Sequence, residues 1–396
     1  MLFLLKFYYV GIDISKYKHD GYVLDEIGTI IHEHFTFSND SNGFEEFRLI
    51  LKSLGSNKEI IRVGLESTGH YGRNLKRFLK DHGYKYMEMN PLLTAKFRQA
   101  LNVAKIKTDK IDSGAIIKTM CAIGFTPAYE TKPEYEELKF LYRERLYFIN
   151  SKAAYKVKII NFYDKVFPEL EHIASLNSAV ARYLFNNYPD PKKIIKTDSN
   201  TLFNTLFRIS RNTFNKIRFN ELIHSAKNSI GKFDNASYFI AKKAMENLIK
   251  VEDDIKDFDD EIDKIVSKLN SPLKDMKGVG NATIAAIYGE FGAFEHFNNA
   301  SEALKYTGII PNINQSGQSD IKGKMSKCGS SHLRCVLMRA MMPLRNSQPV
   351  FKSLYKQKRQ EGKHNKVAES HMVKKFIRVI FHLIKTNTIF DASALR

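Results

Sequence analysis

Cysteine is scarce in this sequence of 396 residues, which has only Cys121, Cys328 and Cys335. No two of them form a Cys-x-x-Cys pair, whereas a disulfide-stabilised scaffold or a zinc ribbon needs several cysteines at close spacing. Both classes of protein are therefore excluded, and we expect a reducing compartment.

Long hydrophobic runs are also missing. No stretch approaches the roughly 18 consecutive apolar residues that suggest a membrane-spanning helix. The chain begins with an apolar segment, but Lys6 interrupts it, no basic residue precedes it and no small-residue cleavage site follows. We expect neither a signal peptide nor a membrane span, and hence a soluble cytoplasmic protein.

Acidic residues are outnumbered. The chain has 43 aspartates and glutamates against 62 lysines and arginines, a net charge of +19, while 43% of its residues are hydrophobic. That apolar content supports folded cores and excludes a wholly disordered basic tail. Residues 316–396 hold 17 basic and 4 acidic residues, whereas residues 245–269 hold 4 lysines and 9 acids. This concentration of positive charge predicts a polyanionic partner, bound through its phosphates near the C-terminal end.

The length predicts two or three domains. Within residues 1–125, apolar runs predict strands at 7–12, 21–24, 29–37, 60–65 and 84–89, and helical spacing predicts helices at 42–54, 71–82 and 109–120. Three strands followed by alternating helices and strands predict an α/β domain with a mixed sheet flanked by helices. That order is compatible with the ribonuclease-H-like arrangement.

Helical periodicity dominates residues 126–270. Apolar residues recur every three or four positions at Leu248, Val251, Ile255, Phe258, Ile262, Ile265 and Leu269. This seam predicts either a coiled coil, as a hairpin or a dimer contact, or a helix that packs once against its own domain. Ser271-Pro272 ends the pattern and opens a mainly helical region, 271–396. Its segment 276–281 is similar to half of a phosphate-binding helix-hairpin-helix, although an ordinary turn before a helix explains the glycines equally well.

Four acids stand at positions where a metal site would form in such a fold. Asp13 and Glu66 each follow a core strand, and Asp109 and Asp112 share one face of a helix. Converging carboxylates repel one another unless divalent cations such as Mg²⁺ or Mn²⁺ neutralise them, and two such ions can hold both sides of a phosphodiester. Taken singly, each acid is better explained as a turn residue or as a partner of a helix N-terminus. The four together favour a metal site.

The same residues carry a family resemblance. Asp13, Glu66 and the run Lys107-Thr108-Asp109-Lys110-Ile111-Asp112 resemble the DEDD signature of bacterial insertion-sequence transposases, which are related to the Piv invertases and described as bridge-RNA-guided recombinases. The second half is similar to this family in residues 306–311, 315–317, 323–329 and 333–334. Over residues 8–125 and 271–385, the resemblance implies a RuvC-like DEDD domain (1–125), a helical coiled-coil region (126–270) and a transposase domain (271–396).

Ser316 lies in the polar stretch 314–319, which we expect to be a loop. By residue type alone an ordinary loop serine is the favoured interpretation, because a hydroxyl becomes a useful nucleophile only where cations or a metal stabilise the developing charge. The family resemblance implies the opposite. There, a serine of the transposase domain attacks a DNA phosphate, forms a 5′-phosphoserine and frees a 3′-hydroxyl. Ser316 matches that serine, and Ser326 is the alternative.

Cations near this serine and along the last helices are expected to contact phosphates. The predicted nucleic-acid-binding residues are Lys107, Lys322, Lys324, Lys327, Arg334, Arg339, Lys356, Lys358 and Arg359. Lys352, Lys363, Lys366, Lys374, Lys375 and Arg378 extend the basic pattern, and the interleaved Phe351, Tyr355 and Phe376 are expected in the core.

The combined hypothesis is an insertion-sequence transposase or site-specific recombinase. The four acids would hold Mg²⁺, which would orient the scissile phosphate and help to activate Ser316 across a domain interface. The expected partners are double-stranded DNA of the element ends and target and further copies of the chain, as a dimer or tetramer. The resemblance alone adds a guide RNA and a place at the prokaryotic nucleoid.

Two other classes of protein remain open. One is a metal-dependent junction-resolving nuclease with a water nucleophile, and the other is a non-catalytic nucleic-acid-binding scaffold whose acids are structural. An actin-like sugar kinase also begins with a strand that ends in aspartate, but the glycine-rich phosphate loops that it needs are not evident.

Overall fold

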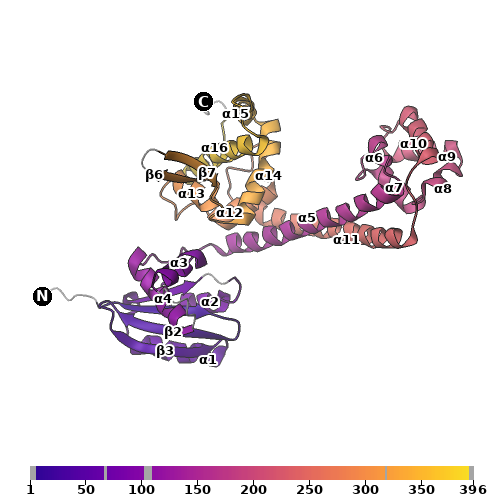
Figure 1. Cartoon of the computed structure of the whole chain (residues 1–396). Coiled ribbons are helices and arrows are strands. Elements are labelled where there is room, and N and C mark those ends of the chain that lie inside the picture. The colour runs from indigo at the N-terminus through magenta and orange to yellow at the C-terminus, as the bar shows by residue number, and fades with distance from the viewer. Residues whose placement is uncertain (1–5, 67–68, 102–108, 317–318, 392–396) are drawn as a thin grey trace. The chain divides into compact units, whose positions relative to one another are not determined.

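A computed structural model describes residues 6–66, 69–101, 109–316 and 319–391 of the chain. For residues 92, 98, 101, 109–112, 312–316, 319–322 and 324 it describes the backbone alone. The chain divides into two compact units, Met1–Glu130 and Thr131–Arg396, and each is described by itself (Figure 1).

A five-stranded mixed sheet forms the centre of the first unit. Its strands are β1 (Tyr8–Ile14), β2 (Lys18–Asp25), β3 (Ile30–Ser38), β4 (Ile61–Glu66) and β5 (Tyr86–Met89), in the order β3-β2-β1-β4-β5. The first three strands are antiparallel, and β4 and β5 run parallel to β1. All five strands were predicted, and the mixed sheet fits the expected ribonuclease-H-like N-terminal domain.

Helices cover both faces of this sheet. The helices are α1 (Ser41–Ser53), α2 (Arg73–Asp81), α3 (Pro91–Leu101) and α4 (Asp109–Ile123), with a short 3₁₀ turn η1 (Lys58–Ile60) before β4. One face packs Val10 and Ile12 against Phe47 of α1 and Leu75 of α2. The other face packs methionines of β5 against Ile116 and Met120 of α4. Helix α3 was not among the helices predicted from the sequence.

Two paired helices of 34 residues each, α5 (Pro133–Val166) and α11 (Asn235–Lys268), form the centre of the second unit. The predicted apolar seam lies between them, with Leu248, Val251 and Ile262 buried and the ring of Phe258 5.3 Å from that of Phe148. Arg145 adds an ion pair with Asp259 at 2.6 Å. The seam therefore packs against a helix of the same chain.

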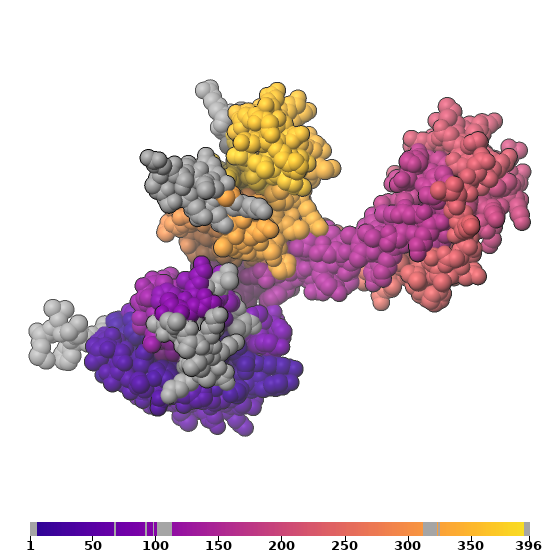
Figure 2. All heavy atoms as spheres, viewed as in Figure 1, coloured from indigo at the N-terminus to yellow at the C-terminus, as the bar shows by residue number. Residues whose placement is uncertain are grey.

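A cluster of short helices packs on one end of this pair (Figures 1 and 2). It comprises α6 (Leu170–Ile173), α7 (Ala179–Asn187), α8 (Pro191–Ile195), α9 (Ser199–Ile209) and α10 (Lys216–Asn228), around a hydrophobic core that it shares with the ends of α5 and α11. Arg182 of α7 forms two hydrogen bonds of 2.8 and 2.9 Å with Glu252 of α11, and Lys152 of α5 lies 3.0 Å from the same carboxylate. These cations lower the pKa of Glu252 to about 2, although its partial burial opposes the shift.

The C-terminal region packs on the other end of the pair. It contains α12 (Asn281–Phe291), α13 (Ala300–Thr307), β6 (Pro311–Ser316), β7 (Ser319–Met325), α14 (Ser331–Ser347), α15 (Pro349–Gln360) and α16 (Asn365–Thr386), around a core shared with the ends of α5 and α11. Phe351 and Phe376 are fully buried, as predicted, while Tyr355 is half-buried and donates a hydrogen bond of 2.9 Å to Asn365.

The prediction that residues 314–319 are all loop is wrong. Residues 314–316 end strand β6 and Ser319 begins strand β7, and the two strands form an antiparallel hairpin in which Ser316 is opposite Ser319. Polar side chains dominate the segment, so it lacks the apolar runs that revealed the strands of the first unit. Pairing with a neighbouring strand makes it a β-structure, and that pairing is not visible in local composition.

A buried acid joins α12 to α5. Glu290 is 5% exposed, and its Oε1 accepts hydrogen bonds from the Tyr142 hydroxyl and from Arg143 Nε, the latter at 2.8 Å. Among the described groups its Oε2 has no hydrogen-bond partner. All three cysteines are free thiols, and no described helix is long and apolar enough to span a membrane.

Candidate active site

Asp13 and Glu66 occupy neighbouring positions at the carboxyl ends of two parallel strands. In the β1–β4 pair, Gly11 is opposite Gly64 and Ile12 is opposite Leu65, so the next positions are Asp13 and Glu66. Because side chains alternate between the faces of a sheet, both acids point to the same face as the two glycines. Both acids are half-buried. The structure thus brings these two predicted residues together.

Helix α4 crosses this face at short range because glycine leaves room for it. A Cβ atom at Gly11 would collide with the carbonyl oxygen of Ser113, and one at Gly64 would lie 3.2 Å from Ile116. A residue larger than glycine at position 11 would therefore push the helix away from the sheet, and one at position 64 would require its side-chain neighbours to shift.

The direction of α4 brings its first turn toward the two acids. Tyr9 of β1 packs against the cluster that holds Ile116 and Met120, and Gly11, two residues later, contacts Ser113. The helix therefore runs antiparallel to β1, and its first turn continues toward the strand's carboxyl end. That turn carries Asp109 and Asp112, for which the backbone alone is described.

Thr94 of α3 fixes the orientation of Glu66. Its side chain is fully buried, and its hydroxyl donates a hydrogen bond of 2.7 Å to Glu66 Oε2. Neither this residue nor the helix that carries it was predicted from the sequence. The signal that could have found the helix is Pro91 at its first position, where a missing N–H costs nothing.

Asp20 is a further acid beside Asp13 that the sequence analysis missed. The two residues are directly opposite in the antiparallel β1–β2 pair and so share a face. Asp20 is 2% exposed and accepts hydrogen bonds from Thr36 Oγ1 at 2.8 Å, His34 Nε2 at 2.9 Å and Lys18 Nζ at 3.4 Å. Burial works to raise the pKa of Asp20, but these hydrogen bonds outweigh it and hold the pKa below its ordinary value.

The donor atoms at this edge suit a hard divalent cation. Carboxylate oxygens are the ligands that Mg²⁺ and Mn²⁺ prefer, and Asp13, Glu66, Asp109 and Asp112 would supply them. Asp20 is already engaged by three donors and suits an electrostatic role better than ligation. Among the side chains that the structure describes, no three His, Cys, Asp or Glu residues form a ready ligand group, and Asp109 and Asp112 fall outside that set.

The predicted nucleophile and its alternative lie on the β6–β7 hairpin and just after it. Ser316 ends β6, and its backbone alone is described. Ser326 follows β7; its backbone N–H bonds to the carbonyl of Ile310 at 2.8 Å and its hydroxyl donates to the carbonyl of Gly308 at 3.3 Å. Arg334 donates from Nη1 to the carbonyls of Thr307 and Gly329. Ser326 and Arg334 therefore help to attach the segment after the hairpin to the end of α13.

The other predicted nucleic-acid-binding residues have varied surroundings. Lys107 lies outside the described residues, and Lys322 and Lys324 are placed by backbone in β7. Lys327, Arg339, Lys356 and Arg359 are exposed, although Arg359 Nη1 donates to the carbonyl of Lys363 at 2.7 Å and Arg339 lies 3.3 Å from Asn150. Lys358 pairs with Glu361 at 2.8 Å.

The glycines before α12 support the ordinary-turn explanation. Gly278 has φ +94°, and a Cβ atom there would lie 3.0 Å from the carbonyl oxygen of Pro343 in α14. Packing therefore requires a glycine at this position without any phosphate. Gly280 has open space around it and precedes α12 without a side-chain cap; it lines a cavity of about 530 Å³ that Arg339 also lines.

Comparison with known proteins assigns the chain to a family. A DEDD-type model described as "Transposase" matches residues 10–168, and a model described as "Transposase IS116/IS110/IS902 family" matches residues 270–356. The pilin gene-inverting protein of Moraxella bovis is 22% identical over 392 residues, 97% of either chain, and that of Moraxella lacunata is 21% identical over the same share. Both models match in the order that the sequence motifs predicted, and the relatives align over nearly their whole length. The chain belongs to the IS110-type DEDD transposases, the family that includes the Piv invertases.

Proposed function

We propose that this chain is a DNA recombinase that cleaves and exchanges strands at the sheet edge occupied by Asp13, Glu66, Asp109 and Asp112. The observation that carries the proposal is the convergence of two strand ends with the first turn of α4. Family membership supports DNA as the substrate, and the two named relatives invert a gene.

Each described residue at this edge has a part in holding a scissile phosphate. Divalent ions, when bound, would supply Lewis-acid stabilisation of the phosphate charge. Asp13 and Glu66 offer oxygen donors from the ends of rigid strands, and Thr94 restricts the orientation of Glu66. Asp20 remains ionised next to Asp13, and its negative charge favours the binding of cations at this edge.

Ser316 is the proposed nucleophile. Its hydroxyl oxygen would attack the phosphorus as the P–O3′ bond breaks, which leaves a 5′-phosphoserine and a 3′-hydroxyl that takes up the proton lost by the serine. A 3′-hydroxyl of another strand then attacks the phosphoserine and restores Ser316. The hydrogen bond from the Ser326 hydroxyl to Gly308 supports Ser316 over Ser326.

The partners follow from this mechanism. Exchange between two duplexes needs several active centres, so the proposed working form is a dimer or tetramer in which the acids and Ser316, carried by separate compact units, act on one phosphate. The proposed guide is a non-coding RNA, which rests on family resemblance alone. The basic C-terminal region would hold the nucleic acid backbone.

Cleavage of labelled element-end DNA, with the guide transcript and Mg²⁺, tests the proposal. We expect Asp13→Asn to reduce cleavage at least a hundredfold, and Ser316→Ala to abolish both cleavage and the covalent protein–DNA adduct. Ser319→Ala, at the opposite position of the same hairpin, is the matched control and should retain both. Cleavage by Ser316→Ala would instead identify a nuclease that uses water, and full activity of Asp13→Asn would leave the acids structural.

A further inference from the structure

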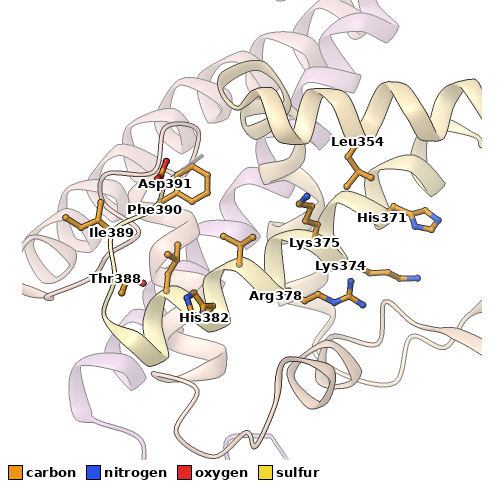
Figure 3. Close-up of a pocket in the computed structure, with 12 residues that line it drawn as sticks. Leu354, His371, Lys374, Lys375, Arg378, His382, Thr388, Ile389, Phe390 and Asp391 are labelled. Atoms are coloured by element: carbon orange, nitrogen blue, oxygen red, sulfur yellow. The ribbon is translucent and has the colours of Figure 1, made fainter. Parts of the chain in front are cut away.

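A cavity of about 730 Å³ lies along α16, in a part of the molecule to which the proposed cleavage site gives no role. Basic groups and apolar groups line it together (Figure 3). The basic side chains come from one helix, and Ile389 and Phe390 come from the segment that follows it. The volume falls within the range of about 300–1,000 Å³ typical of small-ligand sites.

The basic side chains occupy one face of α16. His371, Lys374, Lys375, Arg378 and His382 recur at helical spacing and line the cavity. The opposite face is core, with Met372, Val373, Phe376, Ile377 and Ile380 buried. The helix is therefore amphipathic, and between residues 371 and 382 its polar face carries lysine, arginine and histidine but no acid.

Apolar groups border the same cavity. Helix α16 ends at Thr386. Asn387 after it has a left-handed backbone (φ +51°) that turns the chain back, and residues 388–391 then border the cavity. Ile389 is 72% exposed and Phe390 is half-buried. Leu354 of α15 contributes from another side. An exposed isoleucine next to a phenylalanine, in a cavity that a row of cations also lines, suits a ligand with a flat apolar part and a negative charge.

The electrostatics of the cavity favour an anion. Burial, and then the charge of Arg378, lower the pKa of Lys374. Burial and the charges of Lys374 and Lys358 lower the pKa of His371. The charge of Glu361 acts in the opposite direction. Asp391 is the acid among the residues that line the cavity. An anion placed between Lys374 and Arg378 would relieve their repulsion.

We propose that this cavity takes one unpaired nucleotide of a polynucleotide strand, with its base against Ile389 and Phe390 and its phosphate between Lys374 and Arg378. The inference rests on the proposed function only in taking nucleic acid as the partner. It adds a base-binding site to a helix whose cations were expected to contact the backbone alone. An aromatic wall with nearby cations is the usual combination for binding single-stranded bases without strong sequence preference.

The test compares two DNA duplexes that differ by a single unpaired nucleotide. Fluorescence anisotropy with the full-length protein should show roughly tenfold tighter binding to the bulged duplex than to the perfect one, the effect expected of one stacked base. Phe390→Ala should reduce this preference to within about twofold without changing binding to the perfect duplex. Ile389→Ser, which alters an exposed side chain, should act in the same direction and guards against misfolding of the first variant. Met342→Ala, an exposed apolar residue elsewhere in the C-terminal region, is the matched control and should change neither affinity.

Further arms identify the source of the nucleotide. The same bulge in an RNA duplex, and free thymidine monophosphate as competitor, show whether a DNA strand, an RNA strand or a free nucleotide binds best. The proposal is overturned if the wild-type protein binds bulged and perfect duplexes equally in both the DNA and the RNA series, or if both variants keep the preference for the bulge. Because binding is measured without Mg²⁺, failure of the cleavage mechanism would leave this result intact, and failure here would leave the acid site unaffected.

Discussion

At the scale of single residues, one hydroxyl sets the geometry of the acid edge. Thr94 is buried and donates to Glu66 Oε2 at 2.7 Å, and valine has the same shape without the donor. A hydrogen bond to a charged group contributes about 1.5–3 kcal/mol. We expect Thr94→Val to raise the Mg²⁺ concentration needed for half-maximal cleavage by roughly tenfold, as measured by titrating Mg²⁺ in the cleavage assay.

Thr119→Val provides the control for this prediction. Thr119 is also buried, but its hydroxyl donates at 2.7 Å to the backbone carbonyl of Ala115, within α4. The variant should alter the stability of the protein slightly and leave the Mg²⁺ concentration needed for cleavage unchanged. An equal shift in both variants would show that Thr94 acts through stability alone.

At the scale of elements, the approach of α4 to β1 determines where Asp109 and Asp112 lie. Gly11→Ala would place a methyl group against the backbone of Ser113 and force the helix outward. We expect cleavage to fall at least tenfold, and stability by about 1–3 kcal/mol in a urea titration. Cleavage falls because the first turn of the helix, which carries Asp109 and Asp112, moves with the helix axis.

Gly114→Ala is the matched substitution on the helix itself. Nothing lies within 4 Å of an added Cβ atom there, and alanine favours a helix over glycine by about 1 kcal/mol. This variant should be slightly more stable and fully active. A loss of cleavage equal to that of Gly11→Ala would contradict the role assigned to the close approach.

Strands and helices with an apolar pattern of their own could be predicted from the sequence. Strands that form only by pairing with a neighbouring strand could not. The five strands of the sheet carry apolar runs, so they were found within a few residues of their ends. Strands β6 and β7 are polar and exist by pairing with each other. Asp13 and Glu66 were predicted because each follows a core strand. Asp20 and Thr94 were missed because their roles arise from register and from packing of α3.

At the scale of the whole molecule, positive charge is concentrated in the C-terminal region and negative charge in residues 245–269. This distribution predicts how DNA binding responds to salt. Affinity for duplex DNA should fall linearly on a logarithmic plot against salt concentration. Lys356→Ala, on the exposed surface of α15, should lower the slope by about one unit. Lys256→Ala, also exposed but within the acidic stretch of α11, should leave it unchanged; equal slopes for the two variants would contradict a localised binding surface.

The seam of α11 shows what periodicity can and cannot decide at this scale. Its spacing predicted a packed helical pair, and buried residues such as Leu248 and Ile262 occupy that seam. Spacing alone could not distinguish a partner in the same chain from one in a second copy, because the apolar face is the same in either case. Helix α5, which ends at Val166, supplies the contact although α11 begins only at Asn235.

The paired helices α5 and α11 also hold two hydrophobic cores apart. At about 1.5 Å per residue, 34 residues span about 50 Å between a hydrophobic core at one end and another at the far end. A tilt of about 5° at the C-terminal base would carry the α6–α10 cluster about 4 Å sideways over that length. A ligand bound to that distal cluster would therefore experience small rotations of the base as displacements large enough to make or break a contact.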